Sequence, residues 1–158
     1  MNGRVGRRAV LGAGGAVLLG AGARAASRPR VEVWRDPHCG CCGGWVEHLR
    51  AAGFEVEDRV VQAVAPYRRV LGTPVDLLSC HAGRVGGCGL EGHVPAAAIR
   101  RLLAERPVDV AGLAVPGMPV GSPGMEVPGR AAEAYDVLAW DARGRSRVWM
   151  QARGEHPA

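Results

Sequence analysis

The residues best suited to chemistry are three cysteines within four positions, Cys39, Cys41 and Cys42. They lie between an alternating apolar run at 31–35, which predicts a β-strand, and a run at 42–52 that predicts a helix. The N–H groups and the positive dipole end at the start of a helix favour a thiolate over a thiol. Because a thiolate is both a nucleophile and a soft-metal ligand, this turn predicts either thiol exchange or metal binding.

The spacing of these cysteines favours a metal, although a disulfide stays open. Cys39 and Cys42 have the C-x-x-C spacing of a redox pair, but such a pair has no need of a third thiol at Cys41. A disulfide between Cys41 and Cys42 would be strained, and three neighbouring thiolates would repel one another without a cation. Ligand softness makes Cu(I) the leading candidate, with zinc and iron–sulfur clusters as competitors.

Further ligands of the same kind occur later in the chain. A predicted third strand at 75–82 contains Cys80 and His81, and His93 lies on a neighbouring segment. Two methionines lie in a Pro/Gly-rich loop at 115–125 that is able to fold over the cysteine turn. Thiols with imidazoles and thioethers nearby are typical of copper sites, whereas zinc ribbons use paired C-x-x-C knuckles. The sequence therefore predicts a metal site composed of Cys39, Cys41, Cys42, Cys80, His81, His93, Met118 and Met125.

The sequence gives less reason to place the remaining cysteine, histidines and acidic residues in this site. Cys88 lies between glycines in a predicted turn, and it is left open as a fifth ligand, a disulfide partner or a thiol without a role. His38 precedes the first cysteine and is a candidate to tune the pKa of the thiolates or to bind metal. His48 on the predicted helix is expected to face solvent or a carboxylate. Asp36 and Glu91 are candidate partners for the imidazoles of the site.

The elements that must position these residues form an alternating pattern. Helices are predicted at 42–52, 65–71 and 96–106, and strands at 31–35, 54–61, 75–82, 90–94, 135–141 and 146–151. Cysteines at the first strand-to-helix turn of such an order predict a thioredoxin-like α/β domain, which ends here in a C-terminal β-hairpin. In such a fold Pro74 is expected to be a cis-proline that faces the cysteine turn.

The first 26 residues have the features of an export signal. Arg7 and Arg8 lie in a basic segment and resemble a twin-arginine motif, and a short apolar stretch at 9–22 follows. Ala23-Arg24-Ala25 fits a small-x-small cleavage site, so a single mature domain at 27–158 is expected in the periplasm. The apolar stretch is too short and too weakly hydrophobic to predict stable membrane insertion after signal cleavage.

Composition limits the classes of partner. The 158 residues are 47% apolar, enough for one core, and the net charge is +5 with a pI of about 9.4. The arginines are scattered rather than gathered in a stripe, and no nucleic-acid motif accompanies them. We therefore expect copper ions rather than nucleic acid as the partner.

Four ordered motifs, spread over roughly 31–141, resemble a known family. They are PHCGCCGGW at 37–45, SCH at 79–81, EGHVP at 91–95 and GLAVPGMPVGSPGME at 112–126. They resemble the domain-of-unknown-function 411 family, whose best-known members are the CopG-type copper-resistance proteins of bacterial periplasms. This resemblance implies a thioredoxin-like fold and a cluster of one or several copper ions bound by the thiolates of Cys39, Cys41, Cys42 and Cys80. It also implies redox change at copper and partnership with other periplasmic copper-handling proteins. Cys88 departs from the family pattern.

Two other functions stay open beside copper handling. The predicted fold and the spacing of Cys39 and Cys42 also suit a thiol–disulfide oxidoreductase. The third hypothesis is a small binding module that is stabilised by disulfides. Copper handling and oxidoreductase activity overlap, since a copper cluster that cycles between oxidation states is also a redox enzyme. The sequence does not decide whether the protein is a catalyst.

Overall fold

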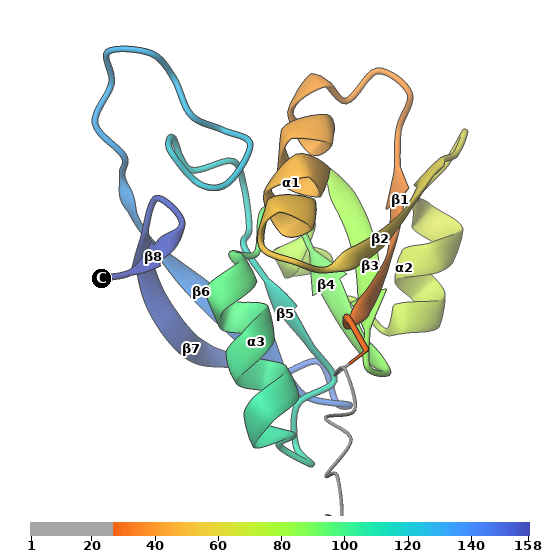
Figure 1. Ribbon diagram of the computed structural model, residues 1–158. Helices are drawn as coiled ribbons and strands as arrows, with labels where there is room; N and C mark the ends of the chain where they lie inside the picture. The colour runs from red at the N-terminus through yellow and green to blue at the C-terminus, as the bar shows by residue number, and fades with distance from the viewer. Residues whose placement is uncertain (1–26) are drawn as a thin grey trace, which may run out of the picture.

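One mixed sheet organises residues 27–158, the part of the chain that the computed structural model describes (Figure 1). The predicted export signal at 1–26 lies outside these described residues. The strands are β1 Arg30–Arg35, β2 Glu55–Val60, β3 His81–Val85, β4 Cys88–Glu91, β5 Gly112–Ala114, β6 Ala134–Trp140, β7 Ser146–Arg153 and β8 His156–Pro157. The helices are α1 Gly40–Ala51, α2 Ala65–Leu71 and α3 Ala96–Glu105, with a 3₁₀ turn at Val75–Leu77. The mixed α/β class predicted from the sequence is confirmed.

The strands follow the order β2-β1-β3-β4-β5-β6-β7-β8 across the sheet. β1 pairs with β2, and β4 with β5, in parallel, whereas the other neighbouring pairs are antiparallel. No helix among residues 27–158 is both long enough and apolar enough to cross a membrane.

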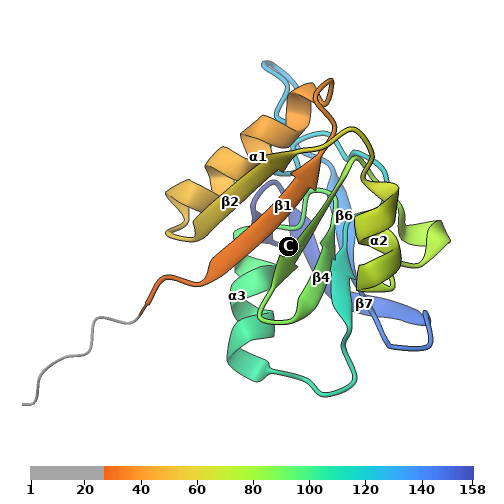
Figure 2. The ribbon, with the colours of Figure 1, turned by 90° about the vertical axis from the view of Figure 1, so that its right-hand side faces the viewer.

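The helices lie on both faces of the sheet (Figure 2), and the main core lies beneath two of them. α1 and α3 cover one face, and α2 lies against the other. Trp45 and Leu49 of α1 and Ile99 of α3 are fully buried in one cluster with Val33 of β1 and Leu90 of β4. Their apolar area, removed from water, is the main force that holds α1 against the sheet.

The first helix is fixed by its own sequence pattern. Its buried residues are Cys42, Trp45, Val46 and Leu49, which lie at the i, i+3, i+4, i+7 positions of one helical face. Gly53 follows its end with a φ of 87°, a conformation that glycine adopts at little cost. Because this face is held by the core, the cysteines on the first turn have a fixed position relative to the sheet.

The third strand differs from the prediction. Residues 75–77 form the 3₁₀ turn, β3 begins only at His81, and the predicted turn at 83–89 contains parts of both β3 and β4. Val75 and Leu78, whose apolar side chains favoured a strand, are 84% and 40% exposed. β3 instead contains Ala82 and Gly83, small residues that carry little hydrophobic signal.

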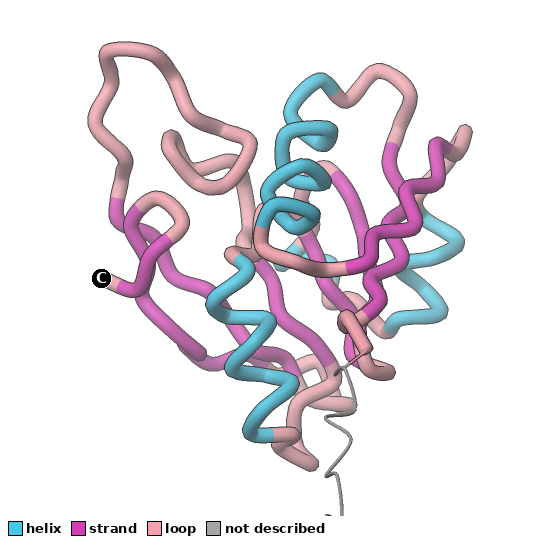
Figure 3. Tube along the Cα trace, in the orientation of Figure 1, coloured by secondary structure: helices cyan, strands magenta, loops and turns pink. Residues whose placement is uncertain are grey.

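Two smaller features also differ from the sequence expectations, namely the peptide bond before Pro74 and the two short strands β5 and β8. The peptide bond before Pro74 is trans, since residues 27–158 contain no cis peptide bond. The short strands β5 and β8 were missed because three and two residues are too few to show a period (Figure 3). β6 and β7 pair antiparallel, with a register shift between Val137 and Leu138.

Candidate metal centre

Three segments meet where the inner strands β1, β3 and β4 have neighbouring ends, and the strand register explains why. Arg35 at the end of β1 lies opposite His81 at the start of β3. Ala82 of β3 in turn lies opposite Glu91 at the end of β4. The turn after β1, the residue before β3 and the residues after β4 are therefore neighbours in space. This arrangement brings Cys80 and His93 to the cysteine turn at the start of α1.

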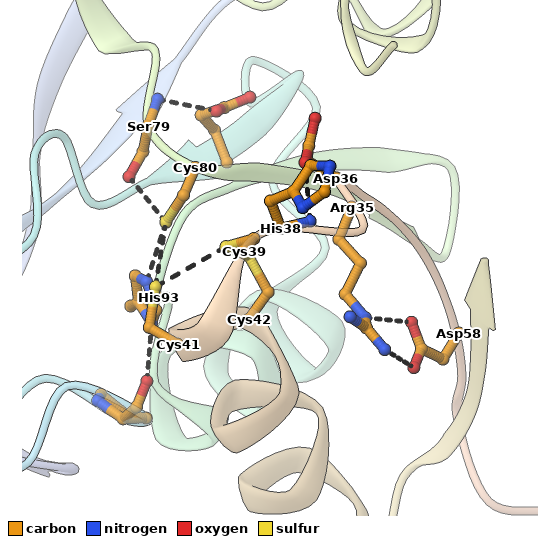
Figure 4. Close-up of a disulfide and its surroundings, with 12 residues drawn as sticks. Arg35, Asp36, His38, Cys39, Cys41, Cys42, Asp58, Ser79, Cys80 and His93 are labelled. Atoms are coloured by element: carbon orange, nitrogen blue, oxygen red, sulfur yellow. Dashed lines mark hydrogen bonds and ion pairs between the residues drawn. A yellow bond between two sulfur atoms is a disulfide. The ribbon is translucent and has the colours of Figure 1, made fainter. Parts of the chain in front are cut away.

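The four cysteines that the sequence predicted as a site lie together (Figure 4). The sulfur atoms of Cys39, Cys41, Cys42 and Cys80 all lie within 4.8 Å of one another. A disulfide joins Cys39 to Cys42, whereas Cys41 and Cys80 are free thiols. Cys41 Sγ is 3.7 Å from Cys39 Sγ and 3.9 Å from Cys80 Sγ. Sulfur atoms this close are able to share a soft metal or exchange a disulfide.

His93 adds an imidazole to this group in a defined tautomer. Its Nδ1–H donates to the carbonyl oxygen of Pro123 at 2.7 Å, which leaves Nε2 as the acceptor. Nε2 lies 2.9 Å from Cys80 Sγ, so the Cys80 thiol donates to it. Burial lowers the pKa of His93, which keeps the ring neutral at pH 7. A neutral imidazole with an unprotonated Nε2 is the form that binds metals.

His81 is the second imidazole of the site. It is fully buried between the Trp45 ring at 4.3 Å and the His93 ring at 5.0 Å, measured between ring centroids. Among residues 27–158, neither ring nitrogen of His81 has a hydrogen-bond partner. An unpartnered buried imidazole is costly, and burial holds its pKa well below the usual range. Ligand atoms of Cys80, His81 and His93 form a second group within 4.8 Å, so Cys80 belongs to both groups.

The protonation of Cys80 bears on any metal it binds. Burial raises the pKa of the Cys80 thiol to about 11, and the nearby Cys41 acts in the same direction. Cys80 is therefore a thiol at neutral pH in the metal-free protein. Since a metal binds the thiolate, uptake must displace this proton.

The Pro/Gly-rich loop at 115–125 packs against the start of α1, as expected. A Cβ atom added at Gly124 would lie 2.5 Å from Trp45 N and 2.8 Å from Cys41 O, so this backbone contact requires glycine. Met118 is 56% exposed, and Met125 is partly buried in the same loop. Ligand roles for the two methionines remain predictions.

Cys88 lies apart from this site. It begins β4, whereas the residues near the cysteine turn follow the other end of that strand. Its Sγ lies 3.7 Å from the carbonyl oxygen of Val110, and the thiol is free and outside both ligand groups.

The remaining histidines and acidic residues have separate contacts. His48 Nε2 accepts from Ala96 N at 3.1 Å, and its Nδ1 lies 3.2 Å from a carboxylate oxygen of Glu155, so this side chain links three parts of the fold. Asp36 accepts a hydrogen bond from the backbone N–H of His38.

The sequence missed the surroundings of Cys80. Glu91, expected to partner an imidazole, instead pairs with Arg68 of α2 and accepts from Ser79 N at 2.8 Å. Arg68 Nη2 also donates to Ser79 O at 2.6 Å. Arg68 and Glu91 are far apart in sequence and belong to different elements, so no local pattern indicates their contact.

Fold and site together define a small mixed α/β protein with a cysteine–histidine cluster able to hold a metal ion. A family model described as "Protein of unknown function, DUF411" matches residues 77–125. Two solved structures, named "Copper resistance protein copG", Form 2 and Form 1, are each 43% identical to this chain. They cover 79% and 82% of this chain and 98% of their own, with TM-scores of 0.73 and 0.71. The chain belongs to the DUF411 family of CopG-type copper-resistance proteins, as its motifs predicted. No curated protein matches the chain.

Proposed function

We propose that this protein binds copper through its cysteine cluster and serves copper handling and resistance. The observation that carries the proposal is the convergence of Cys39, Cys41, Cys42 and Cys80, with ligand atoms within 4.8 Å of one another. Two solved relatives that bear the name copper resistance protein support copper as the metal. Sulfur-rich donor sets favour Cu(I) among biological metals.

The ligand set that we propose begins with the four thiolates. His81 and His93 add neutral imidazoles from the second group, and Met118 and Met125 would supply thioethers from the adjoining loop. Cys80 belongs to both groups, and a thiolate in that position is able to bridge two metal ions. We therefore infer room for more than one copper. A dithiol reductant, itself oxidised to a disulfide, would convert the Cys39–Cys42 disulfide into two thiols, which join the already free thiols of Cys41 and Cys80.

The location that we propose is the periplasm. The basic segment, apolar stretch and small-x-small site of residues 1–26 support export, with 27–158 as the mature single domain. We assign that domain to the thioredoxin-like class because cysteines lie at the first turn of α1, the helix that follows β1. The antiparallel β6–β7 pair is its C-terminal hairpin. A fusion of residues 1–26 to a reporter tests export, and a cytoplasmic reporter would contradict it.

The copper content of the mature protein tests the main proposal. Residues 27–158 are purified without oxygen from copper-supplemented cells, as wild type and as Cys41→Ser. We expect one or more Cu(I) per wild-type chain and most of that copper lost in the variant, because Cys41 lies between Cys39 and Cys80. Zinc, or no metal with the cysteines in disulfides, would overturn the proposal.

A thiol–disulfide oxidoreductase is the second candidate, favoured by the disulfide between Cys39 and Cys42 at the start of α1. Exchange at such a pair needs only these two thiols. Loss of Cys41 or Cys80 should then leave reduction of a model disulfide unchanged, whereas copper binding requires both. Assay of disulfide reduction by Cys41→Ser and Cys80→Ser therefore separates the two functions.

A further inference from the structure

The backbone segment just before β3 has no strand to hold it. Ser79 and Cys80 lie between the 3₁₀ turn and His81, the first residue of β3, so the peptide groups of Ser79 are outside the sheet ladder. Buried backbone N–H and C=O groups nevertheless need partners. The position of Cys80 therefore depends on whatever satisfies the peptide groups of the residue before it.

An ion pair supplies both partners. Glu91 Oε1 accepts from Ser79 N at 2.8 Å, and Arg68 Nη2 donates to Ser79 O at 2.6 Å. The same guanidinium forms a fork on the Glu91 carboxylate, with Nε 3.0 Å from Oε2 and Nη2 2.6 Å from Oε1. Glu91 is fully buried and Arg68 is 17% exposed at the side chain. The pair thus holds the N–H and the C=O of one residue simultaneously.

Two neighbouring contacts fix the same segment from its other side. Ser79 Oγ donates to Gly117 O at 2.6 Å, which joins the segment to the methionine loop. A Cβ atom at Gly92 would lie 2.6 Å from Ser79 Oγ and 2.7 Å from Ser79 Cβ, so the end of β4 approaches Ser79 more closely than a side chain permits. Ser79 and Cys80 are partly buried, and the ion pair is the charged contact of this segment.

Stability alone does not explain a buried ion pair here. The cost of removing two charges from water often exceeds their mutual attraction. A protein with apolar residues of similar volume at both positions is then at least as stable as one with the ion pair. The contacts of this pair are specific. Arg68 donates to Ser79 O and Glu91 accepts from Ser79 N, and the next residue is Cys80, whose sulfur both ligand groups share.

We propose that Arg68 and Glu91 are positioning residues that hold Cys80 at the metal site through the peptide groups of Ser79. This inference rests on the copper-binding function proposed above. The guanidinium is essential because it reaches a carboxylate and a carbonyl oxygen in one plane, which the single ammonium of lysine does not. Outer contacts that orient metal ligands typically contribute 10–100-fold to metal affinity.

The test compares Arg68→Lys with a matched control, Arg101→Lys. Both substitutions are made in the protein of residues 27–158, with its cysteines reduced to thiols. Arg101 likewise contacts a carboxylate, Glu105, and a backbone carbonyl, Trp149 O, but it lies on α3. Cu(I) affinity is measured by competition with a chromogenic Cu(I) chelator. We expect about a tenfold or greater loss of affinity for Arg68→Lys. The control should match the wild type.

A second background separates positioning from general weakening of the fold. In Cys80→Ser the ligand that Arg68 acts through is gone, so Arg68→Lys should produce little further loss of affinity. A purely structural role would lower the melting temperature equally in both backgrounds and reduce affinity in both. That result, or wild-type affinity in folded Arg68→Lys, overturns the inference.

If Arg68→Lys does not fold, Glu91→Gln takes its place. The amide keeps an oxygen for Ser79 N but loses one of the two oxygens that the Arg68 fork uses. We expect a loss of Cu(I) affinity that again depends on Cys80, and wild-type affinity in the folded variant would count against the inference. A wild type without copper refutes the function itself, which distinguishes the two failures.

Discussion

At the scale of single residues, Cys80 connects the two halves of the candidate site. Its sulfur lies 3.9 Å from Cys41 Sγ and 2.9 Å from His93 Nε2, whereas the other three cysteines of the site lie on one turn. Its surroundings also differ, because burial raises the pKa of its thiol to about 11. Both properties make Cys80 the residue at which the copper proposal is most sharply tested.

We predict that Cys80→Ser loses most of its bound Cu(I) while the fold is retained. The substitution removes a soft ligand but leaves the apolar contacts of α1 with the sheet intact. Cys88→Ser is the matched control, because Cys88 lies outside both ligand groups. Copper per chain measured on both variants checks this, and equal copper content in the two would contradict it.

The proton on Cys80 predicts how copper affinity depends on pH. Below a thiol pKa of about 11, Cu(I) must displace a proton from this sulfur. The apparent affinity should therefore fall by up to about tenfold per pH unit of acidification for that one proton. Competition titrations at several pH values measure the slope. The slope should be smaller by one proton in Cys80→Ser, and an unchanged slope would exclude Cys80 as a ligand.

At the scale of elements, the site depends on the loop after β5 packing against the first turns of α1. Pro123 O fixes the tautomer of His93, and the Gly124 backbone touches Cys41 and Trp45. Trp45 Nε1 in addition donates to Val94 O at 2.8 Å, which ties α1 to the segment after β4. Three elements therefore determine where the imidazole Nε2 lies.

We predict that Gly124→Ala displaces this loop. At a φ of 84° an added Cβ atom costs about 1–2 kcal/mol. The contact with Trp45 N adds about 1–3 kcal/mol of overpacking. Gly129→Ala is the control, since its φ of 77° is similar but its Cβ atom would meet open space. Urea unfolding should show the larger loss for Gly124→Ala, together with weaker Cu(I) binding, and equal losses would refute the contact.

At the scale of the whole molecule, neutral buried histidines make stability depend on pH. Burial lowers the pKa of His48, His81 and His93 below the usual histidine value of 6.5. Below pH 6.5 the unfolded chain therefore binds more protons than the folded one. The stabilisation is complete above pH 6.5 and is lost as the pH falls below it.

We predict that the free energy of unfolding of the metal-free protein falls below pH 6.5 by up to about 1.4 kcal/mol per pH unit for each of these histidines. Denaturant unfolding between pH 5 and pH 8 measures this slope. His48→Gln keeps a polar side chain near Ala96 and Glu155 but does not titrate, so it should show a shallower slope. An identical slope would mean that His48 is not neutral in the fold.

The sequence by itself determined the cysteines of the candidate site and the mixed α/β class of the fold. Cys39, Cys41 and Cys42 are adjacent in the chain, and the apolar period of α1 is local, so both can be read without coordinates. The four motifs identified the family for the same reason.

Only the tertiary structure decided how the distant residues are held at the candidate site. The start of β3 at His81, the separation of Cys88 and the hold of Arg68 and Glu91 on Ser79 depend on strand register and burial. Small residues such as Ala82 and Gly83 carry no hydrophobic period, and exposed Val75 imitates one. Contacts between elements far apart in the chain arise when the core forms, and a local pattern therefore does not contain them.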